Sequence, residues 1–347
     1  MLLFIVFLIF FSGGIIFLLP VKRQNKERRT FSILIACRNE ENNITGLIES
    51  IKKINYPCTE FEVIIVDDAS EDETWVILQK LSLSVPNIKI FRLENKSTEY
   101  KGKKAALKLA SENAVNDYFL FTDADCRLPA DVLNSYAKIL SSDVNAAIGW
   151  YKTIDAPAWQ RILDIFSAFV FSVTSYLRAP FSVSGMNWVI KKDAFQNVRG
   201  YSRIKNTVAG DDKLLLLLVK KLKGRIIFNY QCPVQTKLPE KFNIDRLKRK
   251  YGKFESSPVI IKIGFIGLTL LLLYLPIEIF CSGYQTLIFY TGGMYFLWFI
   301  ILKRLRLKFK LIDVLLLPVL PYAILFLTIA GSLGNWSWKG QKSKLSN

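Results

Sequence analysis

The chain has 347 residues, 51% of them hydrophobic, which is enough for one sizeable globular domain together with apolar membrane segments. It contains no histidine, and this excludes a Ser-His or Cys-His nucleophile system and any histidine metal site. The formal net charge of +18 is concentrated beside long apolar stretches, as in cytoplasmic loops of membrane proteins, so we expect a membrane partner and no nucleic-acid partner.

The first segment, residues 1–20, carries no charged residue. Twenty helical residues span about 30 Å, the thickness of the hydrocarbon core of a bilayer, so we expect a transmembrane helix here. A cleaved signal peptide fits less well, because no basic residues precede the apolar run and several follow it between Val21 and Arg29. These basic residues direct the following part of the chain to the cytoplasm.

Residues 30–257 are expected to form the soluble domain. In its first half, apolar strand-like runs alternate with helical runs, which is typical of an α/β domain with a mostly parallel sheet and right-handed crossovers. A further apolar and aromatic run, Trp159 to Leu177, predicts a helix that lies on the membrane surface, over an acceptor site or in the core. Strands are predicted at Phe31–Cys37, Glu62–Val66, Ile88–Leu93 and Tyr118–Thr122, with helices at about Asn43–Lys53, Glu71–Ser82 and Lys103–Ala114.

Residues 258–334 are apolar again and predict a second membrane region. Helices at about 259–281 and 284–302 would form a hairpin, and residues 311–333 would form a further span. Lys262 and Asp313 lie near the ends of these segments, where a charge can reach the interface. The tail, residues 335–347, either lies outside, as four spans require, or rests on the interface.

Three aspartate pairs attract attention because the chain has only 29 acidic residues against 47 basic ones. Asp67-Asp68 and Asp123-Ala-Asp125 directly follow predicted strands, and Asp211-Asp212 opens a leucine-rich helical run. Carboxylates at the carboxyl ends of parallel strands lie where open α/β sheets bind ligands. Such a cluster suits a divalent cation that holds a diphosphate, with one carboxylate left over as a general base.

Two of these pairs also allow a simpler explanation. Ser70 and Glu73 have the spacing of a capping box at the start of a helix. Asp211-Asp212 suits the first turn of a helix through the helix dipole, and in isolation this explanation is the better one. Taken with the other acids, the pair is better explained as the source of a general base.

Asp123 and Asp125 form a more specific pattern, because two carboxylates separated by one residue can approach the same cation. Mg²⁺ or Mn²⁺ is commonly held by one or two carboxylates and diphosphate oxygens, and would act as a Lewis acid on the leaving phosphate. A structural calcium site is less favoured, since few other acids lie nearby in the sequence. The segment Lys101 to Lys104 is either a phosphate-binding corner before a helix or a solvated basic turn.

Six segments between about Phe31 and Pro239 carry a family resemblance through their order and spacing. The segments are Ile33-Leu-Ile-Ala-Cys-Arg-Asn-Glu-Glu41, Val63-Ile-Ile-Val-Asp-Asp-Ala-Ser70, Gly102-Lys-Lys-Ala-Ala-Leu107, Phe121-Thr-Asp-Ala-Asp125, Ser184-Gly-Met-Asn-Trp-Val-Ile-Lys-Lys-Asp-Ala-Phe195 and Gly210-Asp-Asp212. Together they resemble the family-2 inverting nucleotide-sugar glycosyltransferases, in particular the membrane-attached bacterial branch.

The resemblance implies a GT-A fold, which is Rossmann-like, and a nucleoside-diphosphate sugar donor, most often a UDP-sugar. Asp212 matches the catalytic base of a single displacement with inversion, and Asp211 occupies the usual Glu position before it. By the matching motifs, Ala36, Arg38 and Glu40 would line the nucleotide, Asp67 and Asp68 would contact uracil or ribose, Lys103 would lie near the phosphates, Asp123 and Asp125 would hold ribose and metal, and Gly185, Asn187 and Trp188 would face the acceptor.

The chain departs from the processive members of the family, which carry Q-x-x-R-W after the base. Here Lys248, Lys250 and Tyr251 supply a basic and aromatic pattern without the Gln and Trp. This favours single sugar addition to a lipid-linked or envelope glycan acceptor, by a multi-pass protein of the bacterial inner membrane with its catalytic domain in the cytoplasm. The alternatives are a polyprenyl-phosphate glycosyltransferase and a non-catalytic membrane subunit that retained the fold.

Overall fold

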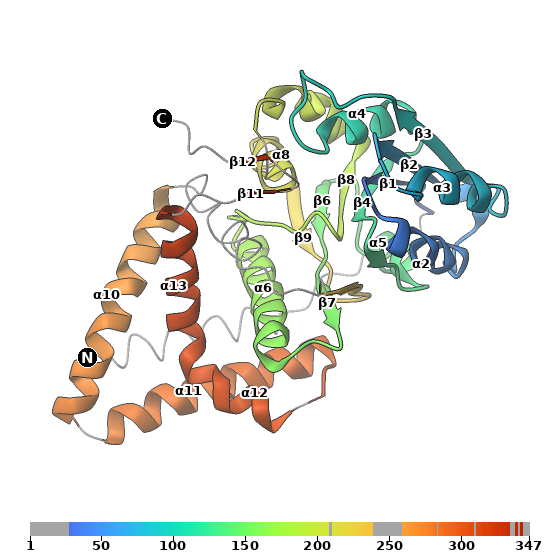
Figure 1. Cartoon of the computed structure of the whole chain (residues 1–347). Coiled ribbons are helices and arrows are strands. Elements are labelled where there is room, and N and C mark those ends of the chain that lie inside the picture. The colour runs from blue at the N-terminus through green and yellow to red at the C-terminus, as the bar shows by residue number, and fades with distance from the viewer. Residues whose placement is uncertain are drawn as a thin grey trace. The chain divides into compact units, whose positions relative to one another are not determined.

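The structure is a computed structural model, and its described residues fall into two compact units (Figure 1). A sheet unit comprises residues 28–155 and 166–238, and a helical unit comprises 156–165 and the described residues from 259 onward. The predicted helix at residues 1–20, Lys248, Lys250 and Tyr251, and most of the tail lie outside the described residues. The structure describes residues 28–207, 210–238, 259–282, 284–308, 310–333, 337–338 and 341–342.

The sheet unit is built on a seven-stranded sheet with the order β3-β2-β1-β4-β8-β6-β9. The four strands from β3 to β4 are parallel, and β8 is antiparallel to both of its neighbours. The α/β fold with a mostly parallel sheet is therefore confirmed. The strands are β1 (Phe31–Cys37), β2 (Phe61–Asp68), β3 (Ile88–Leu93), β4 (Tyr118–Asp123), β6 (Val144–Ile148), β8 (Trp188–Lys191) and β9 (Arg225–Phe228).

Helices connect the parallel strands, as the alternation in the sequence predicts. The predicted strands and helices between Phe31 and Leu177 are all present, with ends that differ by three residues or fewer. A small second sheet joins β5 (Cys126–Arg127), β10 (Val234–Lys237) and β7 (Tyr151–Ile154). The helices are α2 (Glu41–Lys52), α3 (Thr74–Ser82), α4 (Lys104–Glu112), α5 (Val132–Ala137), α6 (Ala158–Tyr176), α7 (Lys192–Asn197) and α8 (Asp211–Val219), with 3₁₀ turns η1 (Cys58–Glu60) and η2 (Gly200–Ile204).

The core of the sheet unit follows from the hydrophobic patterns of its elements. Strands β1 and β2 are almost continuously apolar, which is typical of parallel strands that are covered on both faces. Helix α2 repeats apolar residues with helical spacing, and this stripe is buried against the sheet. The buried residues of the stripe are Ile44, Leu47, Ile48 and Ile51.

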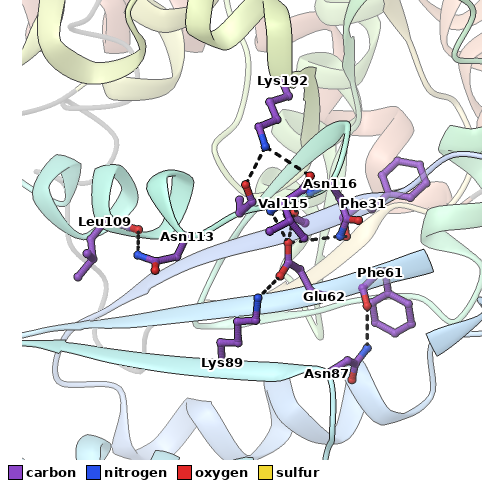
Figure 2. A network of polar contacts seen from close by, with 12 residues as sticks. Phe31, Phe61, Glu62, Asn87, Lys89, Leu109, Asn113, Val115, Asn116 and Lys192 are labelled. Carbon is purple, nitrogen blue, oxygen red and sulfur yellow. Dashed lines mark hydrogen bonds and ion pairs between the residues drawn. The ribbon is translucent and has the colours of Figure 1, made fainter. Parts of the chain in front are cut away.

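A polar network closes the amino ends of the parallel strands (Figure 2). The buried Glu62 carboxylate at the start of β2 accepts hydrogen bonds from the Ser32 hydroxyl at 2.6 Å, the Val115 amide at 2.8 Å and the Lys89 ammonium at 2.7 Å. The Asn116 side chain donates to the Phe31 carbonyl at 2.9 Å. One carboxylate thus ties β1, β2, β3 and the loop before β4 together at the edge opposite the aspartate pairs.

The helical unit contains the apolar part of the chain that follows residue 258. Two stretches, Lys262–Cys281 and Leu311–Ala330, are long and apolar enough to cross a membrane by length and composition. Within the unit, the Tyr322 hydroxyl donates to the Leu272 carbonyl at 3.2 Å, and this bond joins α13 to α10. The elements are α10 (Val259–Ser282), α11 (Tyr284–Leu305), α12 (Leu311–Leu316), the 3₁₀ turn η4 (Leu317–Val319), α13 (Leu320–Leu333) and the short strands β11 (Ser337–Trp338) and β12 (Gln341–Lys342).

One sequence-based expectation about this unit needs correction. The predicted helix 311–333 is divided by η4, where Pro318 has no N–H to donate to an α-helical ladder. Asp313, one of the charges in this apolar region, is buried in an ion pair with Arg161 at the start of α6. The Arg161 guanidinium also donates to the Ala156 carbonyl at 2.7 Å, so the arginine has partners on both sides.

Candidate active site

The carboxyl ends of the parallel strands bring several predicted site residues to one edge of the sheet. Strand β1 lies between β2 and β4, and its Cys37 is in register with Asp67 while Ala36 is in register with Asp123. The first two aspartate pairs therefore start from the same level on either side of β1. This is the crevice position at which open α/β sheets bind ligands.

The third pair reaches the site through helix α8. Gly210 precedes the helix with φ +87°, a conformation that favours glycine, and Asp211 and Asp212 form the first turn. One carboxylate oxygen of Asp212 accepts the Gly185 amide at 3.0 Å, and the other accepts the Lys213 amide at 2.8 Å. The helix-dipole explanation from the sequence therefore holds, and it does not exclude a chemical role for the same carboxylate.

Lys103 joins the acids of β4 to those of α8. Its ammonium donates to Asp123 Oδ1 at 2.5 Å and lies 3.7 Å from Asp211 Oδ2. Burial would lower the pKa of this lysine, but attraction by Asp123, Asp211 and Asp212 outweighs burial and raises the pKa well above its usual range. The site thus contains a permanent cation that gathers carboxylates from distant parts of the chain.

A small pocket opens beside this lysine. Its polar wall includes Lys103, Asp211 and Asp212, and Gly185 contributes backbone without a side chain. A Cβ at Gly185 would lie 3.4 Å from the Lys103 ammonium and 3.6 Å from Asp212 Oδ2, so the glycine allows a ligand to approach both groups. The apolar wall is formed by Leu107, Phe121, Trp188 and Tyr201, together with Thr122.

Tyr201 is a site residue that no motif in the sequence indicated. Its ring packs edge-on against Phe121, with centroids 6.4 Å apart. Burial, and then the negative charge of Asp211, raises the pKa of Tyr201 well above its usual range, so the phenol stays neutral. Only the fold identifies this residue, because it lies in the 3₁₀ turn η2 and becomes part of the site by packing.

Both aspartates at the end of β2 are buried. Asp67 is fully buried, accepts the Ser70 hydroxyl and lies 3.3 Å from the Arg92 guanidinium, and Asp68 is 8% exposed. Arg92 was not singled out in the sequence, and β3 places it in register with Asp67. It also stacks over the Trp75 ring at 5.5 Å.

The predicted capping box at Ser70 and Glu73 is wrong. The chain turns after β2 with Ala69 at φ +55°, and α3 begins only at Thr74. Ser70 is used by Asp67 and by the Asn39 amide, which donates to its hydroxyl at 3.0 Å. The Asp72 carboxylate instead accepts the Thr74 amide at 3.0 Å.

Arg38 and Glu40 lie in the loop after β1 and connect it to the loop after β2. The Arg38 guanidinium donates to the Glu71 carboxylate at 2.9 Å. The Glu40 amide donates to the Thr74 hydroxyl at 2.8 Å, and the Glu40 carboxylate accepts the Asn43 side chain at 2.8 Å. These bonds order the loop at the carboxyl ends of β1 and β2. The contacts of Arg38 and Glu40 with a nucleotide stay predictions.

The predicted acceptor residues are found in different environments. Gly185 and Trp188 line the pocket. Asn187 is fully buried: its amide oxygen accepts the Tyr136 hydroxyl and its nitrogen donates to the Trp150 carbonyl, both at 2.8 Å. Asn187 therefore supports the segment that carries Gly185.

The alternative of a solvated turn at Lys101 to Lys104 is wrong for its last two residues. Lys103 is directed at the acids, and the adjacent Lys104 is completely buried. The Lys104 ammonium donates to the Lys101 carbonyl at 3.0 Å and to the Thr207 carbonyl. A run of lysines in a sequence gives no signal of such burial.

The described side chains offer too few ligands to coordinate a metal ion without help from substrate or water. Among the described residues there is no group of three or more His, Cys, Asp or Glu side chains that could hold a metal. Mg²⁺ and Mn²⁺ are commonly bound through one or two carboxylates, with the remaining ligands from substrate phosphates and water. Asp123 and Asp125 fit this smaller share of a coordination shell.

Comparison with known proteins places these features in a family. Residues 32–199 match the model of glycosyl transferase family 2. The matched part of the chain belongs to glycosyl transferase family 2. The resemblance to family 2 is thereby confirmed, whereas inversion and the membrane-attached branch stay predictions.

Curated relatives match part of this family domain. Poly(ribitol-phosphate) beta-N-acetylglucosaminyltransferase TarS of Staphylococcus aureus (strain Mu50 / ATCC 700699) is 35% identical over 32% of this chain and 18% of its own length. Beta-monoglucosyldiacylglycerol synthase of Trichormus variabilis is 28% identical over 41% and 30%. Dolichol-phosphate mannosyltransferase of Pyrococcus furiosus is 31% identical over 34% and 32%. The matched segments thus span less than a third of these relatives.

A solved structure extends the likeness over the whole chain. The mannosyltransferase PcManGT from Pyrobaculum calidifontis, in complex with GDP-Man and Mn²⁺, aligns with a TM-score of 0.62 and covers 96% of this chain and 98% of its own. The sequence identity is 16%, so this likeness shows the fold alone. The family-2 domain has the GT-A fold that the resemblance implied.

Proposed function

We propose that this family-2 glycosyltransferase moves a sugar from a nucleoside-diphosphate sugar, most readily a UDP-sugar, to a hydroxyl acceptor with inversion. The observation that carries the proposal is the bridge that Lys103 makes between Asp123 and Asp211, beside Asp212. This bridge brings the end of β4, where the donor diphosphate would bind, close to the candidate base Asp212.

In the proposed reaction, Asp212 takes the proton of the acceptor hydroxyl as that oxygen attacks the anomeric carbon. The bond from the anomeric carbon to the diphosphate breaks on the opposite face, which inverts the configuration. The Gly185 amide fixes one oxygen of Asp212 during this transfer. A divalent cation, Mg²⁺ or Mn²⁺ held by Asp123 and Asp125, would supply Lewis-acid stabilisation of the departing diphosphate.

The donor would lie along the carboxyl edge of β1 and β2. Ala36, Arg38 and Glu40 would line the nucleotide, and Asp67 and Asp68 would contact the base or ribose, although Asp67 already engages Ser70 and Arg92. Lys103 would face the phosphates, because it already carries a positive charge at the pocket. These assignments follow from the strand register and the family resemblance together.

The proposed acceptor is a lipid-linked or envelope glycan at the cytoplasmic face of a bacterial inner membrane. Two apolar stretches of 20 residues each support membrane attachment by a multi-pass helical region after a catalytic domain of residues 30–257. Relatives whose names include diacylglycerol and dolichol phosphate support a lipid acceptor. Gly185 and Trp188 would face this acceptor, and the buried Asn187 would support their segment. The acceptor roles of Lys248, Lys250 and Tyr251 stay predictions from the sequence.

The test is sugar transfer in membranes that contain wild type or Asp212→Asn, supplied with UDP-sugars or GDP-mannose and Mn²⁺. Loss of the base should reduce kcat by about 10²- to 10⁴-fold, while donor binding is retained. Asp193→Asn is the matched control, because its carboxylate on α7 is 71% exposed and does not line the pocket. Unchanged turnover in Asp212→Asn would remove Asp212 from the assigned role.

A polyprenyl-phosphate acceptor is the second candidate, and the similarity to a dolichol-phosphate mannosyltransferase favours it. A phosphate oxygen is already ionised and needs little help from a base. With this acceptor, kcat should fall only slightly in Asp212→Asn and severely in Asp125→Ala. A non-catalytic subunit would instead show no binding of a nucleotide sugar by calorimetry.

A further inference from the structure

Lys104 is buried in a place that is unfavourable for a cation. It is the first residue of α4 and has no exposed surface. Burial of an ammonium is costly unless it is hydrogen-bonded, and the amino-terminal end of a helix dipole repels positive charge. Its hydrogen bonds to the Lys101 and Thr207 carbonyls are therefore needed to keep this charge in place.

The partner Thr207 belongs to the segment that leads to the candidate base. It precedes Gly210 by three positions, and Gly210 is followed directly by Asp211 and Asp212. Lys101 and Thr207 are more than one hundred positions apart in the sequence, so the Lys104 ammonium fastens two segments that only the fold brings together. One of these segments carries Lys103 and the other precedes the base helix.

Other hydrogen bonds and an ion pair also connect these two segments. The Lys101 amide donates to the Lys205 carbonyl at 2.9 Å. The Tyr100 and Ser202 hydroxyls are 3.4 Å apart, and Lys205 pairs with Glu99 at 2.9 Å. These contacts are more exposed than Lys104, so water competes with them more strongly.

Neighbouring lysines of one turn thus have separate tasks. Successive residues of a helix are directed about 100° apart around its axis, which follows from 3.6 residues per turn. Lys103 is directed at Asp123 and Asp211, whereas Lys104 is directed at backbone carbonyls. The turn that supplies the cation of the pocket also holds Thr207, three positions before Gly210.

We infer that Lys104 is a positioning residue for catalysis: by tying the Thr207 carbonyl to the start of α4, it sets the place of the Asp211–Asp212 turn relative to Lys103 and Asp123. The inference rests on the proposed function, in which Asp212 is the base. Lys104 itself touches no substrate in this scheme, since it has no exposed surface.

The experiment compares full-length wild type, Lys104→Met and Lys104→Arg, with Lys52→Met as the matched control on an exposed ion pair of α2. Three quantities are measured: the Kd of UDP and of GDP with Mn²⁺, kcat for sugar transfer, and amide hydrogen exchange without ligand. Lys104→Met should lower kcat by about 10- to 100-fold, because small displacements of a catalytic group are costly. The nucleotide Kd should change by less than about threefold, well below the tenfold that 1.4 kcal/mol represents.

Hydrogen exchange should accelerate in residues 201–219 of Lys104→Met and remain unchanged elsewhere in the sheet unit. Lys104→Arg, which keeps the charge and its donors, should retain more kcat than Lys104→Met. If Lys104→Met does not fold, Lys104→Arg is compared with the wild type instead. Lys104→Arg should then show a lower kcat and faster exchange in residues 201–219 than the wild type, with a loss of kcat below about 10-fold.

Unchanged kcat and exchange, or equal losses of kcat and nucleotide affinity with uniformly faster exchange, would overturn the positioning role. Failure of the wild type to transfer sugar from any donor would overturn the proposed function instead. In that case the exchange data still decide whether Lys104 holds the 201–219 segment.

Discussion

At the scale of single residues, charge balance holds the candidate site together. Asp123, Asp211 and Asp212 surround one ammonium, so the cluster keeps a net negative charge even with Lys103 in place. Such a cluster attracts a cation and positions a carboxylate for proton transfer. Lys103 offsets the mutual repulsion of these acids, so the arrangement of the site depends on Lys103 as well as on the acids.

Replacement of Lys103 should affect both rate and pH dependence. In Lys103→Met, loss of the cation that faces the reacting groups should lower kcat by about 100-fold. Because a positive charge favours the ionised form of nearby carboxylates, its removal should shift the acid limb of the pH–rate profile to higher pH. Steady-state kinetics between pH 5 and pH 9 measure both effects.

Lys103→Arg distinguishes charge from shape in this prediction. It keeps the positive charge, so its acid limb should stay near that of the wild type even where kcat falls. If the pH–rate profile of Lys103→Met has the same shape as that of the wild type once both are scaled to the same maximum, an electrostatic role for Lys103 is contradicted.

At the scale of elements, the two ends of the parallel strands have different tasks. The amino ends are closed by the Glu62 network, while the carboxyl ends carry the aspartate pairs (Figure 2). Burial of Glu62 would raise its pKa, but hydrogen bonds from Lys89, Ser32 and the Val115 amide outweigh burial and lower it. The ionised carboxylate therefore stabilises the folded state.

The direction of the pH dependence follows from this lowered pKa. The stabilisation by Glu62 is fully present above the unfolded-state pKa, near 4.5, and is lost as the pH falls through the lower folded-state pKa. Glu62→Gln should reduce the free energy of unfolding at pH 7 by about 1.5–3 kcal/mol, the usual contribution of a hydrogen bond to a charged group.

Urea unfolding of wild type and Glu62→Gln at pH 7 and pH 3.5 measures this effect. The difference between the two proteins should shrink at the lower pH. Glu49→Gln, which removes a surface carboxylate paired with Lys52, should be nearly neutral. Equal destabilisation by the two substitutions would show that the Glu62 network does not secure the strands.

At the scale of the whole molecule, apolar surface dominates the helical unit. Helices α10 and α13 expose many large apolar side chains, among them Leu270, Leu273, Phe280 and Phe326, which water solvates poorly. A bilayer would cover such surface over the two apolar 20-residue stretches.

The full-length protein should therefore remain in the membrane pellet after washing with 1 M salt or with carbonate, conditions that release peripheral proteins, and should need detergent for release. This prediction is checked by fractionation and immunoblotting. Complete extraction by carbonate would show that the helical unit does not span a bilayer.

The sequence by itself determined the periodic elements of the sheet unit and the class of its chemistry. Apolar runs and helical stripes predicted the strands from β1 to β4 and helices α2 to α4, because burial of an apolar face dictates their period. Acids placed after those strands predicted the ligand-binding edge. The matched family motifs added Asp212 and Lys103.

The tertiary structure alone decided which of these polar residues meet. The sequence did not indicate Arg92, Tyr201 or the burial of Lys104, and it assigned Ser70 to a helix cap that does not form. A polar side chain has no period of its own, and its partners here come from segments far apart along the chain. Local pattern therefore fixes what each element is, whereas packing fixes which charges face each other.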